Sequence, residues 1–220
     1  MNISLYLLGM VSFASLASSE LVELPKFNDD EFHQWQSKVF SGETQYTVLS
    51  AKNILHAQSI GSASGLMFSQ KIDLEKTPYI NWRWKIDKKL ENLAENTKAG
   101  DDYAARIYLV RNEGMFMWNV SSLNYVWSSD HAAGEHWDNA YAGAKVKMLA
   151  IRDASAEVGV WYPEKRNVFQ DMVELFGDKG SEQANLDSYQ FIDVVALMTD
   201  TDNSALEASS YYGHITFSAE

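Results

Sequence analysis

Three side chains that could act on a ligand lie close together between residues 100 and 110. If this segment is a strand, Asp102, Arg106 and Tyr108 point to the same side, because alternate residues of a strand share a face. An acid, a guanidinium and a phenol in one row form either a polar binding face or an ion-pair network that braces the sheet. A buried arginine needs a charged partner, and Asp101 and Asp102 are nearby candidates. Both interpretations are kept here.

The same residues could cleave a polysaccharide. A glycoside hydrolase needs two carboxylates that face one cleft, which Asp102 and either Glu164 or Asp171 would supply. A lyase needs instead a base and a cation that stabilises the developing enolate. The candidates for catalysis are Tyr108 or His214 as the base, Arg106 as the cation and Asp102 as an acid.

Aromatic residues are abundant, with 7 Trp and 11 Tyr in the chain. Rings with polar neighbours suit the flat faces of sugars, although rings in a loop also simply pack against one another. We predict a non-enzymatic glycan-binding protein whose partner is a small saccharide or a polysaccharide, neutral or weakly charged; a polysaccharide-cleaving enzyme is the alternative. The predicted ligand-binding residues are Asp102, Arg106, Tyr108, Asn124, Trp127, Trp137 and Trp161.

The acidic turn Asp200-Thr201-Asp202-Asn203 is a candidate calcium site. Closely spaced oxygen ligands are what a hard cation prefers. The spacing does not match a complete calcium loop, however, and Asp and Asn also favour turns through bonds to their own backbone. We therefore predict that the protein requires no cofactor and that this segment is a structural turn. The alternative is a structural calcium ion bound by Asp200, Asp202 and Asn203.

Charge and hydropathy restrict the partners and the location. The chain has 18 basic and 30 acidic residues, a formal charge of −12, which argues against binding to nucleic acid or to an anionic membrane. Residues 1–19 have the apolar stretch and the small residues of a secretory signal peptide, whose removal would leave a chain starting near Glu20. No later segment is apolar enough to span a membrane. We expect a periplasmic or secreted protein.

Short segments with alternating apolar residues dominate the chain after residue 20. Turn signals such as Gly61-Ser62 separate them, and few helical patterns lie between them. This organisation predicts an all-β fold, an antiparallel β-sandwich of jelly-roll type that forms a single domain over residues 20–220. The predicted strands are 45–50, 53–59, 66–72, 79–86, 103–110, 122–127, 145–151, 158–162, 191–199 and 214–218.

One helix is predicted to begin at Val168. Apolar residues recur at Met172 and Phe176, and Gly177 stands where a helix-ending glycine belongs. The segment 32–40 also has helical spacing, but it could equally be extended.

Several motifs together resemble an uncharacterised bacterial family, the domain of unknown function 3047. They occur in order from about residue 55 to the end of the chain. The resemblance implies an exported protein and no assigned activity. The matching pieces are ASGL at 63–66, WRWK at 82–85, GDDYAARIY at 100–108, NYVW at 124–127, RNV at 166–168, MTDTDN at 198–203 and YGHITF at 212–217.

Overall fold

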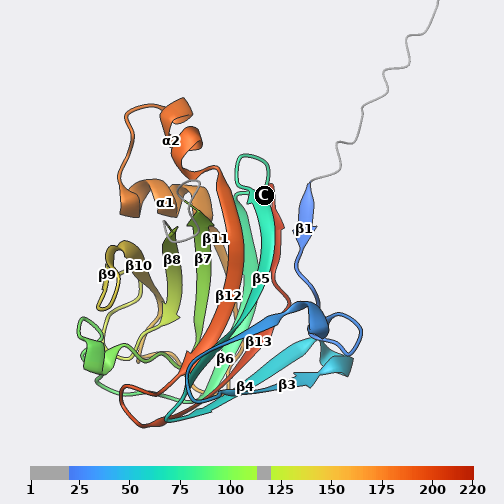
Figure 1. The fold of residues 1–220 in the computed structure, drawn as a ribbon, viewed down its shortest axis with the longest axis vertical. Helices are drawn as coiled ribbons and strands as arrows, with labels where there is room; N and C mark the ends of the chain where they lie inside the picture. The colour runs from blue at the N-terminus through green and yellow to red at the C-terminus, as the bar shows by residue number, and fades with distance from the viewer. Residues whose placement is uncertain (1–19, 113–119) are drawn as a thin grey trace, which may run out of the picture.

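The computed structural model describes residues 20–112 and 120–220, in which two curved sheets pack face to face (Figure 1). The predicted signal peptide lies outside the described residues. Sheet A has the order β1 (Leu21–Glu23), β14 (Thr216–Ser218), β6 (Tyr79–Lys88), β13 (Glu207–Gly213), β4 (Ile54–Ile60) and β3 (Gln45–Leu49), with β11 (Tyr162–Asn167) also paired to β6. Sheet B has the order β2 (Gln36–Ser41), β5 (Ala63–Asp73), β12 (Phe191–Asp200), β7 (Arg106–Asn112), β8 (Val120–Trp127), β10 (Gly143–Arg152) and β9 (His136–Asn139).

The pairing is antiparallel between the described strands, except that β8 and β10 run parallel. This arrangement confirms the predicted antiparallel β-sandwich. No helix in the described part of the chain is long and apolar enough to cross a membrane.

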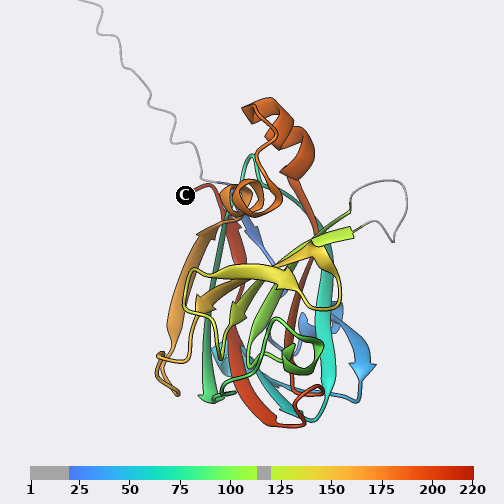
Figure 2. The same ribbon diagram turned by 90° about the vertical axis from the view of Figure 1, so that its left-hand side faces the viewer.

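The main core lies between the two sheets. Large rings such as Trp84 of sheet A and Tyr125 of sheet B are fully buried there, together with Ile107 and Leu109 of β7. Because side chains alternate along a strand, Arg106 and Tyr108 point to the opposite face of sheet B, away from sheet A. A smaller apolar cluster that includes Trp137 and Met148 lies separate from the main core. Figure 2 views the molecule from the side of β9 and β10, drawn in yellow.

Two helices pack together at one end of the sandwich (Figure 1). The predicted helix is confirmed as α1 (Val168–Phe176): the Asn167 side chain accepts a hydrogen bond from the Gln170 amide at 3.0 Å, and Gly177 follows with a φ of 96°. Helix α2 (Glu182–Tyr189) was not predicted, because its sequence is mostly polar and has no apolar stripe.

Some predicted strand boundaries are wrong. The segment 158–162 is largely a turn, with a φ of 76° at Gly159, and β11 starts only at Tyr162. The ambiguous segment 32–40 forms a short 3₁₀ turn (Phe32–Gln34) and then the extended β2. Strand β2 was missed because all its residues are exposed, so no apolar alternation marks it.

Strand β7 also begins later than predicted, at Arg106 instead of Tyr103. The residues before it do not continue the alternation, and the Tyr103 ring lies against Arg106, with 4.6 Å between the guanidinium carbon and the ring centre. Tyr103 therefore lies beside Arg106 on the polar face of sheet B, although strict alternation of side chains from residue 103 would place it on the opposite face. In the register of sheet B, Arg106 lies opposite Met198 and Val126.

Candidate functional site

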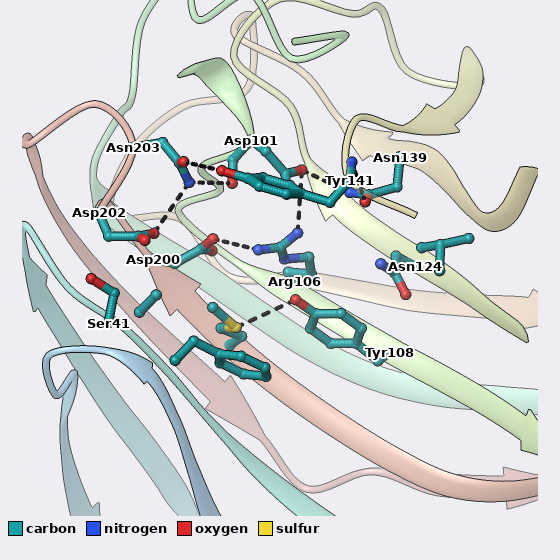
Figure 3. A pocket seen from close by; sticks show the side chains of 14 residues that line it. Ser41, Asp101, Arg106, Tyr108, Asn124, Asn139, Tyr141, Asp200, Asp202 and Asn203 are labelled. Atoms are coloured by element: carbon teal, nitrogen blue, oxygen red, sulfur yellow. Dashed lines mark hydrogen bonds and ion pairs between the residues drawn. The ribbon is translucent and has the colours of Figure 1, made fainter. Parts of the chain in front are cut away.

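A cavity of about 370 Å³ opens on the outer face of sheet B (Figure 3). Its floor comes from the adjacent strands β12, β7 and β8, which contribute Asp200, Arg106, Tyr108 and Asn124. Loops at one end of the sheet complete its walls. Sequence positions as distant as 40 and 203 thus meet around one space, because strands from four parts of the chain are neighbours in this sheet.

An ion-pair network occupies the cavity floor. Arg106 Nη2 pairs with Asp200, and Arg106 Nη1 lies 3.6 Å from Asp101 Oδ1. Burial raises the pKa of Asp200 to about 8, with help from the Asp102 and Asp101 carboxylates, although Arg106 acts in the opposite direction. The Arg106 Nε is buried and has no hydrogen-bond partner among the described residues. The predicted polar face is therefore both a brace and a cavity floor.

Asp102 does not pair with Arg106. It is fully buried, and its carboxylate accepts hydrogen bonds from the backbone amides of Ser204 at 2.6 Å and Asn203 at 3.2 Å. These bonds hold the turn between β12 and β13. The expectation that Asp102 contacts a ligand or acts as a catalytic acid is contradicted, because its oxygens are engaged and it does not line the cavity. Its role is to position the turn that carries Asp202.

Tyr108 and Asn124, two of the predicted ligand-binding residues, lie on the cavity floor, and both have donors with weak partners. The Tyr108 hydroxyl donates to the Met198 sulfur at 3.3 Å, and Asn124 Nδ2 donates to the Met148 sulfur at 3.4 Å. A thioether is a weak acceptor, so both donors remain available to a better one. Burial raises the pKa of Tyr108, which keeps its hydroxyl protonated.

Two exposed aromatic rings also line the cavity. Phe40 of β2 is 64% exposed, and Tyr141, in the turn between β9 and β10, is 56% exposed. The Tyr141 hydroxyl donates to Asn203 Oδ1 at 2.6 Å, so the ring reaches across to the β12–β13 turn (Figure 3). Sequence reasoning did not select either ring. Tyr141 follows Trp137 by four residues, but nothing in the sequence placed Phe40 near either of them.

The three predicted tryptophans do not line this cavity. Trp127 is 3% exposed and packs in the core, with its ring centre 5.8 Å from that of Trp84. Trp137, in β9, is buried in the smaller apolar cluster, and its ring stacks on that of His131 with 3.8 Å between the ring centres. Trp161 is attached to sheet A, next to Tyr211 of β13. None of the three is a stacking face of this cavity.

A parity argument could have excluded Trp127. Asn124 and Trp127 are three residues apart in one strand and must point to opposite faces. Since Asn124 is on the polar side, Trp127 belongs to the core.

The carboxylates proposed as catalytic partners of Asp102 lie elsewhere. Glu164 pairs with Arg152 and accepts from Trp84 Nε1 at 3.0 Å, on sheet A. Asp171 accepts from Arg166 Nε at 3.0 Å and from the Tyr125 hydroxyl at 2.6 Å. The structure contradicts both hydrolase pairs. The Arg166–Asp171 pair at the start of α1 is a structural brace.

His214 does not reach the polar face either. Its Nε2 lies 2.8 Å from the carbonyl oxygen of Leu24, the residue that follows β1 of sheet A. The lyase interpretation therefore keeps Tyr108 and Arg106 but loses His214.

The predicted calcium ligands are partly brought together. One carboxylate oxygen from each of Asp102, Asp200 and Asp202 lies within 4.8 Å of the others. Asn203 instead donates its Nδ2 to Asp102 and to Asp202, each at 3.2 Å. Because Asp200 is paired with Arg106 and Asp102 with backbone amides, these side chains already have donors as partners. The calcium site stays a prediction.

Comparison with protein families identifies the class of this chain. It belongs to the family described as "Protein of unknown function (DUF3047)", whose model matches residues 33–216. The resemblance found in the sequence motifs is thereby confirmed. A search of curated proteins returned no match.

Several solved structures are similar to this chain at low sequence identity. One is a meso-active thermostable cellulase derived from Cel12A of Rhodothermus marinus, with 10% identity, a TM-score of 0.47, and coverage of 89% of this chain and 99% of that one. Another is the family 11 carbohydrate-binding module of Clostridium thermocellum in complex with a mixed-linked tetrasaccharide, with 11% identity, a TM-score of 0.45 and coverage of 91% and 96%. A third is the xyloglucanase domain of NopAA from Sinorhizobium fredii, with 9% identity, a TM-score of 0.47 and coverage of 84% and 92%.

Proposed function

We propose that this protein binds a saccharide in the cavity on the outer face of sheet B. The observation that carries the proposal is the combination of two exposed rings, Phe40 and Tyr141, with a polar floor between strands. A pyranose ring has apolar C–H faces and a hydroxyl-bearing rim, so it needs both kinds of contact. The rings supply the apolar contact.

The floor supplies polar contacts that suit hydroxyl groups. Tyr108 and Asn124 present donors that now meet only sulfur atoms, and a sugar hydroxyl is a better acceptor. Asp202 presents carboxylate oxygens as acceptors. Because a saccharide hydroxyl both donates and accepts, it can satisfy both kinds of group. The cavity volume lies within the usual range for small-ligand sites, about 300–1,000 Å³.

The test is a glycan array followed by calorimetric titration of the best ligand. Tyr141→Ala and Phe40→Ala should each weaken binding at least about tenfold, as expected for aromatic anchors. Trp161→Ala is the matched control, since Trp161 is attached to sheet A and should leave the affinity unchanged. If no saccharide binds, or if only Trp161→Ala weakens binding, the proposed site is wrong.

Cleavage of the bound saccharide is the competing activity, and the site argues against its lyase form. Lyases act on uronates, whereas the described lining has three carboxylates, from Asp101, Asp200 and Asp202, against a single cation, Arg106, that would stabilise the enolate. Burial raises the pKa of Tyr108, so its hydroxyl stays protonated and the tyrosinate needed to act as the base is not formed. Incubation of the purified protein with a polysaccharide panel decides the matter. New reducing ends, with or without the absorbance of an unsaturated sugar, would show that the protein cleaves saccharides and is not only a binding protein.

A further inference from the structure

The cavity has an excess of negative charge. Three carboxylates line it, from Asp101, Asp200 and Asp202, and the described lining contains one cationic side chain, Arg106. Asp102 lies directly behind, with an oxygen within 4.8 Å of those of Asp200 and Asp202. The excess is present whether Asp200 is ionised or protonated, because the other acids still outnumber the guanidinium.

Asp202 is the acid that remains open to a ligand. It is only partly buried, and its side chain accepts a hydrogen bond from Asn203 Nδ2 at 3.2 Å. Among the described residues it has no ion pair. Lys98 is nearby, but its ammonium group lies against the Tyr141 ring, with 5.1 Å between Nζ and the ring centre, and it does not line the cavity.

Arg106 is a second and independent sign of a ligand. Its side chain is 4% exposed and lines the cavity, yet Nε finds no acceptor among the described residues. A buried donor without an acceptor is costly, so a ligand in the cavity that offers an acceptor atom to Nε would stabilise the site. A ligand that fits must therefore offer an acceptor to Arg106 and a positive charge to the carboxylates.

We infer that the preferred ligand is an amino sugar with a free ammonium group, such as an oligomer of glucosamine. This inference rests on the proposed saccharide site. The ammonium group would pair with Asp202 and Asp101, and the neighbouring hydroxyl would accept from Arg106 Nε. An aromatic ring beside a cation adds a further attraction, which Tyr141 and Phe40 are placed to provide. A uronate is repelled by the same acids.

Calorimetric titration with three oligosaccharides of equal length tests the preference: a glucosamine oligomer, its fully N-acetylated form, and a neutral glucose oligomer. The glucosamine oligomer should bind at least about tenfold more tightly than either, equivalent to about 1.4 kcal/mol. The preference should shrink as salt is raised, because the site is open to solvent.

Variants test whether the Asp202 carboxylate causes the preference for the amino sugar. Asp202→Asn should weaken binding of the glucosamine oligomer by a larger factor than binding of the neutral oligomer. Asp30→Asn, an exposed acid in the N-terminal segment, should change neither affinity. Equal affinities for the three oligomers, or an equal effect of Asp202→Asn on all of them, would overturn the amino-sugar inference and leave the saccharide site standing. If none of the three binds and the array is also blank, both proposals fail.

Discussion

At the scale of single residues, Arg106 holds the site together. It is the one cation on the cavity floor in the described lining, and it joins Asp200 of β12 to Asp101 of the preceding loop. Its guanidinium carbon also lies 4.6 Å and 5.0 Å from the ring centres of Tyr103 and Tyr108. The sequence left open whether this arginine is a brace or a binding residue. The structure gives it bracing contacts and, through its unpaired Nε, a donor for a ligand.

Replacing Arg106 should therefore destabilise the protein. In Arg106→Met, Asp200 and Asp101 stay buried without their cation, and the loss of one partner of a buried pair costs about 3–5 kcal/mol. Urea denaturation followed by circular dichroism measures this loss. Arg83→Met is the control, because Arg83 is exposed and its guanidinium lies over the Trp161 ring, so its loss should cost less than about 1 kcal/mol. Equal midpoints for the two variants would show that Arg106 is no brace.

At the scale of elements, a buried acid ties the two loops beside the cavity. Glu95, in the loop that leads to β7, accepts hydrogen bonds from the Ser128 hydroxyl at 2.7 Å and from the Ser129 amide at 2.6 Å. The loop that follows β8 is thereby tied to the one that carries Asp101. Gly100 is required in this tight path, because a Cβ there would collide with the backbone of Ala94. Burial raises the pKa of Glu95 above its ordinary 4.5.

This raised pKa predicts a pH dependence of stability. The folded state holds the Glu95 proton more tightly than the unfolded state, so its stabilising contribution is complete below pH 4.5 and is lost as pH rises through the folded pKa. Glu95→Gln cannot titrate. Its unfolding free energy relative to the parent should therefore rise with pH across this window. Urea denaturation of both proteins between pH 4 and pH 8, at intervals of about one pH unit, measures the difference between their unfolding free energies.

Glu91→Gln is the control for this titration, since Glu91 is exposed in the same loop. It should leave the pH profile of the parent unchanged. A Glu95→Gln profile parallel to that of the parent would mean that Glu95 has the same proton affinity in the folded and unfolded states.

At the scale of the whole molecule, the first described strand starts beside the predicted leader. Strand β1 begins at Leu21 and pairs with β14, so residues 21–23 belong to the edge of sheet A. Removal of residues 1–19 would leave this pairing intact. The acidic chain contains no cysteine, so an exported form would depend on its core and not on disulfides.

We predict that the leader is cleaved during export. Mass spectrometry of the protein recovered from the periplasm or the medium should show a chain that starts near Glu20. A chain that keeps residues 1–19 and remains in the cytosol would contradict the predicted location. A variant with charged residues in the apolar stretch, such as Leu7→Lys with Leu8→Lys, should retain the protein in the cytosol.

The sequence by itself determined the class of fold and much of the local structure. Alternating apolar residues predicted the sandwich, and the pattern from Val168 to Gly177 predicted α1, because both signals depend on neighbours along the chain. Alternation also placed Arg106 and Tyr108 on one face. It failed at Tyr103, where the chain is not yet a strand.

Only the tertiary structure decided which residues share the site. Arg106 and Asp200 are 94 positions apart and meet because β7 and β12 are neighbours in sheet B. The convergence of Phe40 with Tyr141, and the burial of Trp127, likewise depend on strand order and on which face of each sheet meets the other. Periodicity reveals that a strand has two faces, but which face is buried depends on contacts with segments far away in the chain, and local residue patterns do not encode those contacts.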